Sequence, residues 1–336
     1  MTLELRLPGV QATIQDGGRP GFGHLGVPRG GAVDTRGLAI ANLLIRNESD
    51  AATVELAIGG AELRVLKAVV VGLGGADLDA RVLPLGRRLE PNASYRLAAD
   101  EILHFGGPVS PRGVRAYVAV PGGVDAPVVL GSRSTCLAGR FGGIDGRQLR
   151  TGDRIVVSDR SRTLEPATWP RPARHRARTR PDAGEPVTVR FIASDHVPRH
   201  SIDALTTTSW SVSPHSDRMG LRLSGTQLGG DAGGPVLSHG VTWGTIQVPP
   251  DGQPIVLLAD HQPTGGYPVA GVVITADLWL LGQLGATAEL RFQEVSLAAA
   301  IAALRQDRVA FGAERAAFEA GQATLETPRS VADGIR

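Results

Sequence analysis

The chain has 336 residues, of which 42% are apolar and 20% are charged, and its formal net charge is +2. A chain of this length predicts about two domains. The 44 glycines and 23 prolines follow no period, which excludes a collagen-like repeat and favours a turn-rich β protein. The arginines are not interleaved with aromatic residues, so the composition argues against nucleic-acid binding.

The first half of the chain predicts many short strands and one helix. Apolar and polar residues alternate over residues 3–8, which predicts a first strand, and a Gly-rich loop follows over residues 15–31. Asp34 is placed to cap a helix over residues 35–46. Further strands are expected at residues 53–58, 61–66, 69–72, 94–97, 102–105 and 116–120. One helix among short strands predicts a sandwich or barrel lobe rather than a βαβ sheet.

Residues 160–186 differ in composition from both flanking regions, because they contain seven Arg and five Pro with few bulky apolar residues. We interpret this segment as an exposed linker, and a basic arm that binds a partner is the alternative. The expected organisation follows from this break in composition. It comprises a β-rich lobe at 1–160, the linker at 161–186, a second β-rich lobe at 187–295 and a helical tail at 296–336.

The second half again predicts short strands, at residues 187–193, 209–212, 221–223, 254–259, 272–274 and 288–292. Thr275 is expected to cap a short helix that ends at residue 284.

In the tail, apolar residues at spacings of three and four predict an amphipathic helix that is interrupted near Gly312. Arg308 and Arg315 occupy the two skipped positions of its apolar stripe, and we expect the helix to dock on a neighbouring lobe or on a partner chain. The apolar members of the stripe are Leu297, Ile301, Leu304, Phe311 and Phe318.

Several common mechanisms need residues that the chain lacks. Lys67 is the only lysine and does not follow a glycine, so there is no lysine-containing phosphate loop, Ser-Ser-Lys amidase triad or Met-Lys-Met biotin carrier site. Pro198 lies between His196 and His200, so we expect no helical pair of metal ligands and no metal site. Cys136 is the only cysteine, which fits a reducing cytoplasm, and no apolar run is long enough for a membrane span.

Three polar loops rich in Gly or Pro remain as candidate sites. They combine carboxylates, which can act as general bases, with Arg and backbone N–H donors, which can hold an oxyanion or a phosphate. The alternative for each loop is a solvated turn, and Asp217 beside Arg218 is also typical of an ion pair or a turn cap. The candidate residues are Gln15, Asp16, Arg19, His24, Asp217, Arg218, Gln247, Asp251, Asp260, Gln262, Thr264, Gly265, Gly266 and Tyr267.

At these loops the sequence resembles a known family. The stretches that carry the resemblance are IQDGGRPGFGHLGVPRGGAVD at 14–34, VPGGVDAPVVLGSRST at 120–135, SPHSDRMG at 213–220 and GTIQVPPDGQPIVLLADHQPTGGYP at 244–268. They are similar to allophanate hydrolase subunit 2, also called the biotin-dependent carboxyltransferase-like family, over residues 3–293. The resemblance implies a mainly β fold with cyclophilin-like β-barrel architecture. It also implies a partner, a homologous first subunit of the same type as the B component of 5-oxoprolinase or allophanate hydrolase subunit 1.

The resemblance first implies the C component of a 5-oxoprolinase, whose complex also contains a lactam-using A component and uses ATP to open 5-oxoproline to L-glutamate. In that case Asp217, Asp251 or Asp260 would activate water and Arg218 would stabilise the developing charge, while the other candidate residues would bind substrate. A carboxyltransferase subunit that uses carboxybiotin and urea is the second possibility, with Tyr267 against the biotin ring. The third is a non-catalytic regulatory partner of the first subunit.

The chain departs from the family pattern at three positions in the third loop. Val269 stands where the family usually has Lys or Arg, His261 stands where it often has Arg or Ala, and Pro263 replaces a common Thr.

Overall fold

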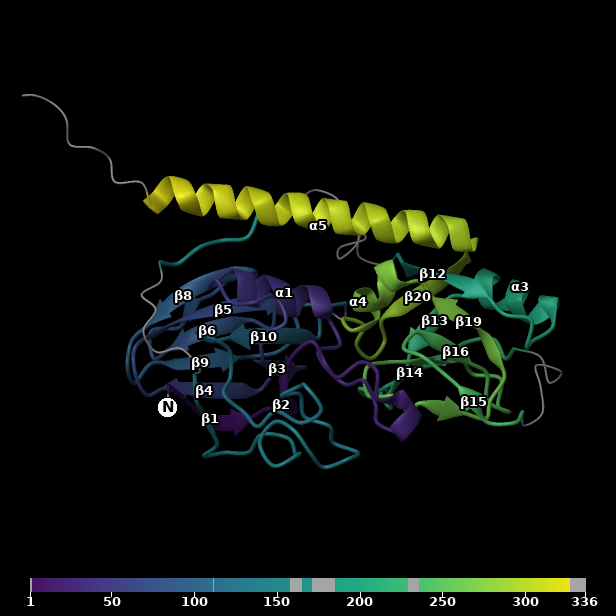
Figure 1. Ribbon diagram of the computed structural model, residues 1–336, viewed down its shortest axis with the longest axis horizontal. Coiled ribbons are helices and arrows are strands. Elements are labelled where there is room, and N and C mark those ends of the chain that lie inside the picture. Colours follow the sequence, from purple (N-terminus) through teal and green to yellow (C-terminus); the bar gives the residue numbers. More distant parts are fainter. Residues whose placement is uncertain (1, 111, 158–164, 171–184, 229–235, 327–336) are drawn as a thin grey trace, which may run out of the picture.

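The computed structural model describes residues 2–110, 112–157, 165–170, 185–228 and 236–326, and of residues 322–326 it describes the backbone alone. Two β-rich lobes lie side by side, and one long C-terminal helix lies along both of them (Figure 1). The first lobe is formed by residues 2–157 and the second by residues 187–294. None of the described helices is both long and apolar enough to cross a membrane. The fold is mainly β, as the sequence predicts.

The first lobe is a sandwich of two antiparallel sheets that enclose one apolar core. The six-stranded sheet has the order β11-β1-β4-β9-β6-β7 and the five-stranded sheet has the order β2-β3-β10-β5-β8. Strands β2, β6 and β7 are additional to the expected ones. Runs of four and two residues in β6 and β7 are too short to show a clear period, whereas polar and apolar residues do alternate in β2. The strands are β1 (Leu3–Pro8), β2 (Gln11–Gln15), β3 (Thr53–Ala57), β4 (Ala61–Val65), β5 (Val69–Gly75), β6 (Ala80–Leu83), β7 (Arg87–Arg88), β8 (Ala93–Leu97), β9 (Ile102–Phe105), β10 (Arg115–Ala119) and β11 (Arg154–Ile155).

Helix α1 (Thr35–Leu43) packs directly against the backbone of β5. Asp34 caps the helix, as the sequence predicts, because its side chain accepts hydrogen bonds from two backbone N–H groups of the first turn. A Cβ atom on Gly72 or Gly74 of β5 would lie 2.1 Å from a carbonyl oxygen of the helix. The helix reaches this distance only because both positions lack a side chain.

The second lobe is a closed β-barrel, in agreement with the expected barrel architecture. Its strands follow the order β12-β19-β16-β17-β14-β13-β20, and a parallel pairing of β12 with β20 closes it. A two-stranded ribbon of β15 (His239–Gly240) and β18 (Thr264–Gly265) lies outside the barrel sheet. The barrel strands are β12 (Val187–Ala193), β13 (Trp210–Val212), β14 (Gly220–Ser224), β16 (Thr245–Gln247), β17 (Ile255–Leu257), β19 (Val269–Val273) and β20 (Glu289–Glu294).

Short helices of the second lobe differ from the expectation. Helix α3 (Arg199–Thr207) begins directly after Pro198, so this proline is not evidence against a helix, because at the N-cap it interrupts no helical hydrogen bond. After Ile274 the chain forms a short 3₁₀ turn, η2 (Thr275–Asp277), and then α4 (Leu278–Leu281). The expected capping by Thr275 is wrong, because neither of these elements has a side-chain cap.

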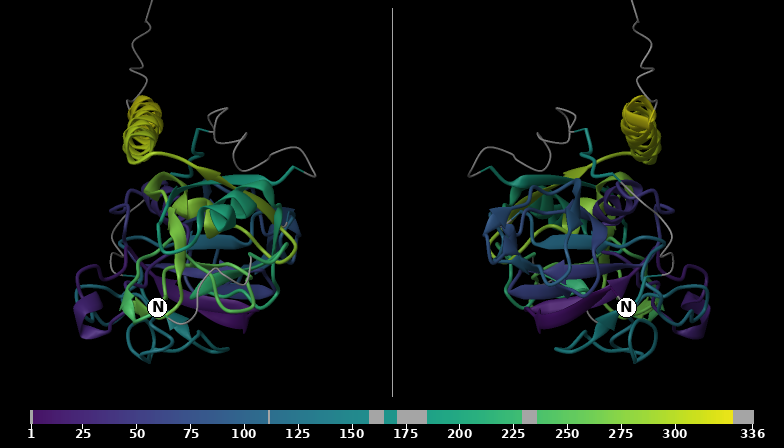
Figure 2. Two further views of the ribbon diagram at one scale, coloured as in Figure 1. Left: turned by 90° about the vertical axis from the view of Figure 1, so that its right-hand side faces the viewer. Right: turned by 90° about the vertical axis from the view of Figure 1, so that its left-hand side faces the viewer.

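Helix α5 (Leu297–Glu326) forms the tail and is continuous through Gly312, so the expected interruption is wrong. Figure 1 shows it as a long rod along both lobes, and Figure 2 shows it nearly end-on at the edge of the molecule. Leu297 and Ile301, which were expected in the buried stripe, are 63% and 43% exposed. The stripe that is at least half-buried consists of Ala300, Ala303, Leu304, Asp307, Phe311, Glu314 and Phe318.

Two acidic residues, rather than Arg308 and Arg315, therefore interrupt the apolar stripe of α5. Both of them bind Arg36 of α1, whose Nη1 donates to Asp307 at 3.0 Å and whose Nη2 donates to Glu314 at 2.8 Å. The helix is thereby attached to the first lobe by charge as well as by packing.

A tryptophan from the expected linker completes this attachment. Trp169 stacks on Phe311 and Phe318 of α5, with ring centroids 5.8 and 5.0 Å apart, and its Nε1 donates to Glu314 at 3.2 Å. It is 2% exposed, so the expectation of a solvated linker is wrong at this residue. Residues 161–164 and 171–184 of the expected linker lie outside the described residues.

Candidate functional site

The Gly-rich loop after β2 is anchored at its start by buried hydrogen bonds. The carboxylate of Asp16 accepts bonds from the backbone N–H of Gly18 at 2.8 Å and from the hydroxyls of Ser132 at 2.6 Å and Ser134 at 2.5 Å. The amide of Gln15 donates to the Thr13 hydroxyl at 3.0 Å, and both Gln15 and Asp16 are buried. These two residues, predicted to bind substrate, therefore hold the base of the loop in the described conformation.

Past this base, the loop crosses from the first lobe to the second. Its neck is closed by a hydrogen bond from the backbone N–H of Arg19 to the carbonyl oxygen of Arg29 at 2.7 Å. The next residue, Gly30, donates to the carbonyl oxygen of Ala259 in the second lobe at 3.0 Å. His24 lies in the exposed 3₁₀ turn η1 (Gly23–Leu25) of the segment between them. The loop is thus held at its neck and contacts the turn that follows β17 and contains Asp260.

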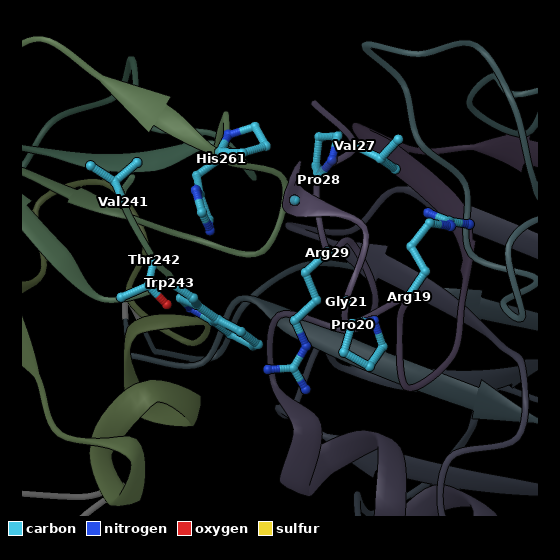
Figure 3. Close-up of a pocket in the computed structure, with 12 residues that line it drawn as sticks. Arg19, Pro20, Gly21, Val27, Pro28, Arg29, Val241, Thr242, Trp243 and His261 are labelled. Carbon is cyan, nitrogen blue, oxygen red and sulfur yellow. The ribbon is translucent and has the colours of Figure 1, made fainter. Parts of the chain in front are cut away.

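A cleft between the two lobes opens beside this neck and has a volume of about 210 Å³ (Figure 3). We call it the interlobe cleft. One wall comes from the Gly-rich loop and the other from the segments around Trp243 and His261. Its lining residues are Arg19, Pro20, Gly21, Gly23, Val27, Pro28, Arg29, Val241, Thr242, Trp243, His261 and Pro263. This lining, as far as the structure describes it, contains two arginines and no carboxylate.

Arg29 and Trp243 meet across the cleft. The guanidinium carbon of Arg29 lies 5.4 Å from the centroid of the Trp243 ring, which is within the range of a cation–π contact. Figure 3 shows the two side chains approaching each other from opposite lobes. Loss of hydration lowers the pKa of the Arg29 guanidinium, and it still remains protonated at any ordinary pH. The cleft therefore contains a permanent positive charge.

His261 contributes a neutral imidazole to the same space. Its Nδ1 lies 2.6 Å from the carbonyl oxygen of Gln262, so Nδ1 carries the proton and donates it to this oxygen. Burial lowers the pKa of His261, although that hydrogen bond and the charge of Asp260 act in the opposite direction. A neutral ring with its proton on Nδ1 has a free lone pair on Nε2. His261 can thus accept a hydrogen bond or a proton from a ligand.

The side chain of Arg19 is 1% exposed and is largely engaged by the first lobe. Its Nη2 donates to the carbonyl oxygen of Ser134 at 2.5 Å, its Nε to that of Val129 at 3.4 Å, and its guanidinium lies over Phe141. Nη1 has no hydrogen-bond partner among the described residues. Arg19 is the predicted substrate-binding residue that the structure places in the lining of the cleft.

Behind the cleft, Arg218 joins the two lobes as part of a buried ion-pair network. Its Nε and Nη2 bind the carboxylate of Asp260 at 2.8 and 2.9 Å, Nη2 also donates to the carbonyl oxygen of Gly31 at 2.6 Å, and Nη1 binds Glu55 of β3. Arg218 is 2% exposed. Its guanidinium is therefore occupied in a structural ion pair, but with Asp260 and Glu55 rather than with the neighbouring Asp217 that the alternative named.

The charges of this network stabilise one another strongly. Burial by itself raises the pKa of Glu55, but the guanidiniums of Arg218 and Arg115 and the hydroxyl of Tyr117 outweigh it, so this pKa lies below its ordinary value. Burial likewise acts to lower the pKa of Arg218, and the carboxylates of Asp260 and Glu55 raise it above its ordinary value. Glu55 and Arg218 are therefore both ionised at neutral pH.

The other two predicted general bases cap turns. The carboxylate of Asp217 accepts hydrogen bonds from the backbone N–H groups of Met219 at 2.8 Å and Gly220 at 3.2 Å, and Asp251 accepts one from Gln253 at 3.0 Å. Neither residue lines the interlobe cleft. For Asp217 this matches the alternative of a turn cap.

The remaining predicted binding residues gather at the ribbon β15–β18. Gln247 is 2% exposed, and its Nε2 has no partner among the described residues. That nitrogen would lie 2.2 Å from a Cβ on Gly265, so the glycine leaves room for the amide. Tyr267 is 42% exposed. Val269, at the position where the family usually has a cation, is buried in β19. The neighbours along this loop are Gln262, Thr264 and Gly266, which do not line the cleft.

Three residues that shape the cleft, Arg29, Trp243 and His261, were not among the candidate site residues predicted from the sequence. Arg29 lies inside the Gly-rich stretch that carries the resemblance, and Trp243 directly precedes the stretch that begins at Gly244. In the sequence, Arg29 could be noticed only as an arginine between Pro28 and Gly30. Its place in the cleft depends on Trp243, which faces it from the other lobe.

This two-lobed arrangement agrees with comparisons to known proteins. Residues 25–294 match the family model described as "Carboxyltransferase domain, subdomain A and B". The chain belongs to this carboxyltransferase-domain family.

Two bacterial relatives match this carboxyltransferase-domain chain along nearly its whole length. It is 37% identical over 310 residues to the C component of 5-oxoprolinase from Escherichia coli, covering 91% of this chain and 95% of that protein. It is 32% identical to the C component of 5-oxoprolinase from Haemophilus influenzae, covering 89% and 93%. It is also 28% identical to urea amidolyase of Lachancea kluyveri, but there it spans only 17% of the relative.

Solved structures of longer chains contain the same fold. The crystal structure of TTHA0988 matches with a TM-score of 0.77 at 32% identity, and this chain spans 55% of it. The crystal structure of the Kluyveromyces lactis urea carboxylase matches with a TM-score of 0.78 at 25% identity, and this chain spans 28% of it. In both structures the matched part is one section of a longer polypeptide.

Proposed function

We propose that the chain is one component of an ATP-dependent complex that opens the cyclic amide 5-oxoproline to L-glutamate. The observation that carries this proposal is the match to the C component of 5-oxoprolinase from Escherichia coli, which extends over 95% of that protein. This chain spans only 17% of each urea amidolyase, so these relatives contain a section similar to this chain within a much longer protein.

The proposed reaction has three steps. The γ-phosphoryl group of ATP is transferred to the lactam oxygen, which makes the carbonyl carbon a better electrophile. A water oxygen adds to this carbon, the ring C–N bond breaks, and the nitrogen takes up a proton to become the amine. A second water then displaces the phosphate and leaves L-glutamate, ADP and inorganic phosphate.

The interlobe cleft is the place where this chain meets the substrate in our proposal. Its positive charge from Arg29 suits an anion, and the neutral ring of His261 suits the N–H group of a lactam. The cleft is smaller than the about 300–1,000 Å³ typical of sites for drug-sized ligands, so it fits a small molecule. Asp260, a candidate general base, and Arg218, the candidate for stabilising charge, are occupied with each other, so we assign neither role to them.

The partners in this proposal are a homologous first subunit, of the same type as the B component of 5-oxoprolinase, and a lactam-using A component, in a complex that operates in the cytoplasm. Lys67, the only lysine, lies exposed in the turn between β4 and β5, far along the chain from the residues that line the cleft. We therefore assign the use of ATP to the complex as a whole.

A carboxyltransferase component that uses carboxybiotin is the second candidate function. It is favoured by the family description and by the structural match to urea carboxylase. Trp243 gives the cleft a flat aromatic wall and Arg29 a cation, which together suit a carboxylated ring. Biotin would supply the carboxyl group in that case, and this chain would position it.

Reconstitution with the two partner proteins tests the proposal. The purified three-component complex is incubated with 5-oxoproline, with and without ATP, and the released glutamate is measured. We expect glutamate only with ATP and only when this chain is present. An intact complex that releases none would contradict the proposal, and transfer of a carboxyl group from carboxybiotin to urea would establish the alternative.

A further inference from the structure

Arg29 presents a positive charge in the interlobe cleft. Among the described residues its guanidinium has no hydrogen-bond or ion-pair partner, and it contacts the face of the Trp243 ring. We propose that Arg29 binds the carboxylate of the substrate and thereby makes this protein selective for cyclic amides that carry a carboxylate. This inference rests on the proposed function and adds a specificity-determining residue to it.

The charge balance around the cleft supports a carboxylate ligand. Arg218 is neutralised by Asp260 and Glu55, and Arg36 by Asp307 and Glu314, whereas the described lining of the interlobe cleft contains no Asp or Glu. Arg29 itself is exposed, so a ligand that enters the cleft can reach its guanidinium. A bound anion would supply the missing partner of Arg29.

The fixed orientation of Arg29 favours a planar anion. Its backbone carbonyl is held by the N–H of Arg19 and its guanidinium rests on Trp243, so both ends of the residue have a defined position. A guanidinium presents two parallel N–H groups, which match the two oxygens of a carboxylate. Trp243 is 6% exposed and lies in the core of the second lobe, so it is a rigid support.

His261 lies across the cleft and offers a complementary group. Its Nε2 can accept a hydrogen bond from the N–H of a lactam ring, while Arg29 binds the carboxylate on the neighbouring carbon. Figure 3 shows His261, Trp243 and Arg29 around one common space. A five-membered lactam with an attached carboxylate presents both groups on the same edge. A neutral amide such as urea would leave Arg29 without its partner.

Removal of the charge at Arg29 tests the proposal in the assembled complex. In Arg29→Gln we expect the KM for 5-oxoproline to rise about 10- to 100-fold with a small change in kcat, as for a lost charged hydrogen bond. Arg29→Lys keeps the positive charge but lacks the two parallel N–H groups of a guanidinium, so its KM should rise less. Arg87→Gln removes an exposed arginine of β7 and is the matched control, with unchanged KM.

The analogue 2-pyrrolidone, which lacks the carboxylate, provides a second arm. With the wild-type complex, ATP hydrolysis in its presence should require about 10- to 100-fold higher concentrations than with 5-oxoproline, and Arg29→Gln should remove this preference. A preference that survives Arg29→Gln, or a substitution that lowers kcat alone, would overturn the proposal.

Direct binding separates this inference from the proposed function. Calorimetric titration of the complex with 5-oxoproline, 2-pyrrolidone and inorganic phosphate does not require turnover. Binding of 5-oxoproline that is lost in Arg29→Gln would support the inference even if the complex releases no glutamate. Absence of 5-oxoproline binding to the wild-type complex, or Arg29-dependent binding of phosphate in its place, would refute it.

Discussion

At the scale of single residues, the arginines differ in what their guanidiniums bind. The backbone brings the segments around Arg218 and Asp260 together, because the carbonyl oxygen of Arg218 accepts a hydrogen bond from the N–H of Asp260 at 3.0 Å. The two side chains then pair in a bidentate arrangement and are buried. Arg29 lies on the exposed side of a loop and meets only an aromatic ring among the described residues. The first arginine is therefore structural, and the second is available to a ligand.

Replacement of Glu55 should change how stability depends on pH. The lowered pKa of Glu55 means that its charge stabilises the fold fully above its unfolded value of about 4.3, and that this stabilisation is lost as pH falls through the lower folded value. The free energy of unfolding of Glu55→Gln should be lower than that of wild type by about 3–5 kcal/mol at neutral pH. The difference should shrink below about pH 4.3.

Urea unfolding of the two proteins between neutral and acid pH measures this difference. Asp100→Asn is a suitable control, because Asp100 is 75% exposed in its pair with Arg64 and should contribute less than about 1 kcal/mol. A difference between Glu55→Gln and wild type that remains constant or grows in acid would show that Glu55 is not held ionised by its partners.

At the scale of elements, the position of helix α5 depends on a residue outside the helix, Trp169. A small apolar cluster joins α1, Trp169 and α5. Glu314 of α5 is bound on one side by Arg36 and on the other by the indole of Trp169. A second cluster, with Ala300 and Ala303, joins the start of α5 to the second lobe. The helix is thus attached to both lobes.

Removal of the Trp169 side chain should release the later part of α5. In Trp169→Ala the free energy of unfolding should fall by about 3–5 kcal/mol, as expected for a large buried aromatic residue, or α5 should detach locally. Hydrogen exchange distinguishes the two results, and in either case the amides around Phe311 and Phe318 should exchange faster. Val309→Ala, at a residue that is 73% exposed, should change stability by less than about 0.5 kcal/mol. Unchanged exchange in α5 would contradict the role given to Trp169.

At the scale of the whole molecule, one buried polar network determines how the lobes meet. Glu55 accepts a hydrogen bond from the hydroxyl of Tyr117 at 2.8 Å and binds Arg218 of the other lobe. Gln283 of the second lobe donates to Asp34 at 2.6 Å, so the cap of α1 is also part of this interface. The interlobe cleft lies beside these contacts, since Arg19, Arg29 and His261 of its lining adjoin the segments that carry them.

Replacement of Arg218 should therefore lower the stability of both lobes rather than that of a single turn. Arg218→Met removes the guanidinium that pairs with both Glu55 and Asp260 and leaves the buried carboxylate of Asp260 without it, which should cost about 3–5 kcal/mol and shift the thermal unfolding of both lobes. Differential scanning calorimetry measures the transition, and Arg222→Met, at an exposed residue of β14, is a control of the same size. A complex with Arg218→Met that is fully stable would contradict the network.

The sequence by itself determined the elements whose signal is local. The alternating pattern of β1, the capping of α1 by Asp34, and the apolar runs of β12 and β17 depend on neighbours within a few residues. The mainly β fold and the family follow from such patterns and from the quoted stretches. The loops that meet at the cleft were also visible, as runs rich in Gly and Pro.

Only the tertiary structure decided which polar side chains are free to act. Arg218, Arg19 and Arg29 are equivalent in a sequence, because a guanidinium looks the same whether its partners lie one turn away or in another lobe. Folding gave Arg218 two carboxylates from distant segments, Glu55 of β3 and Asp260 of the turn after β17, and left Arg29 facing Trp243. Burial and pairing are properties of contacts between segments far apart along the chain, which is why the candidate site changed while the expected fold was largely confirmed.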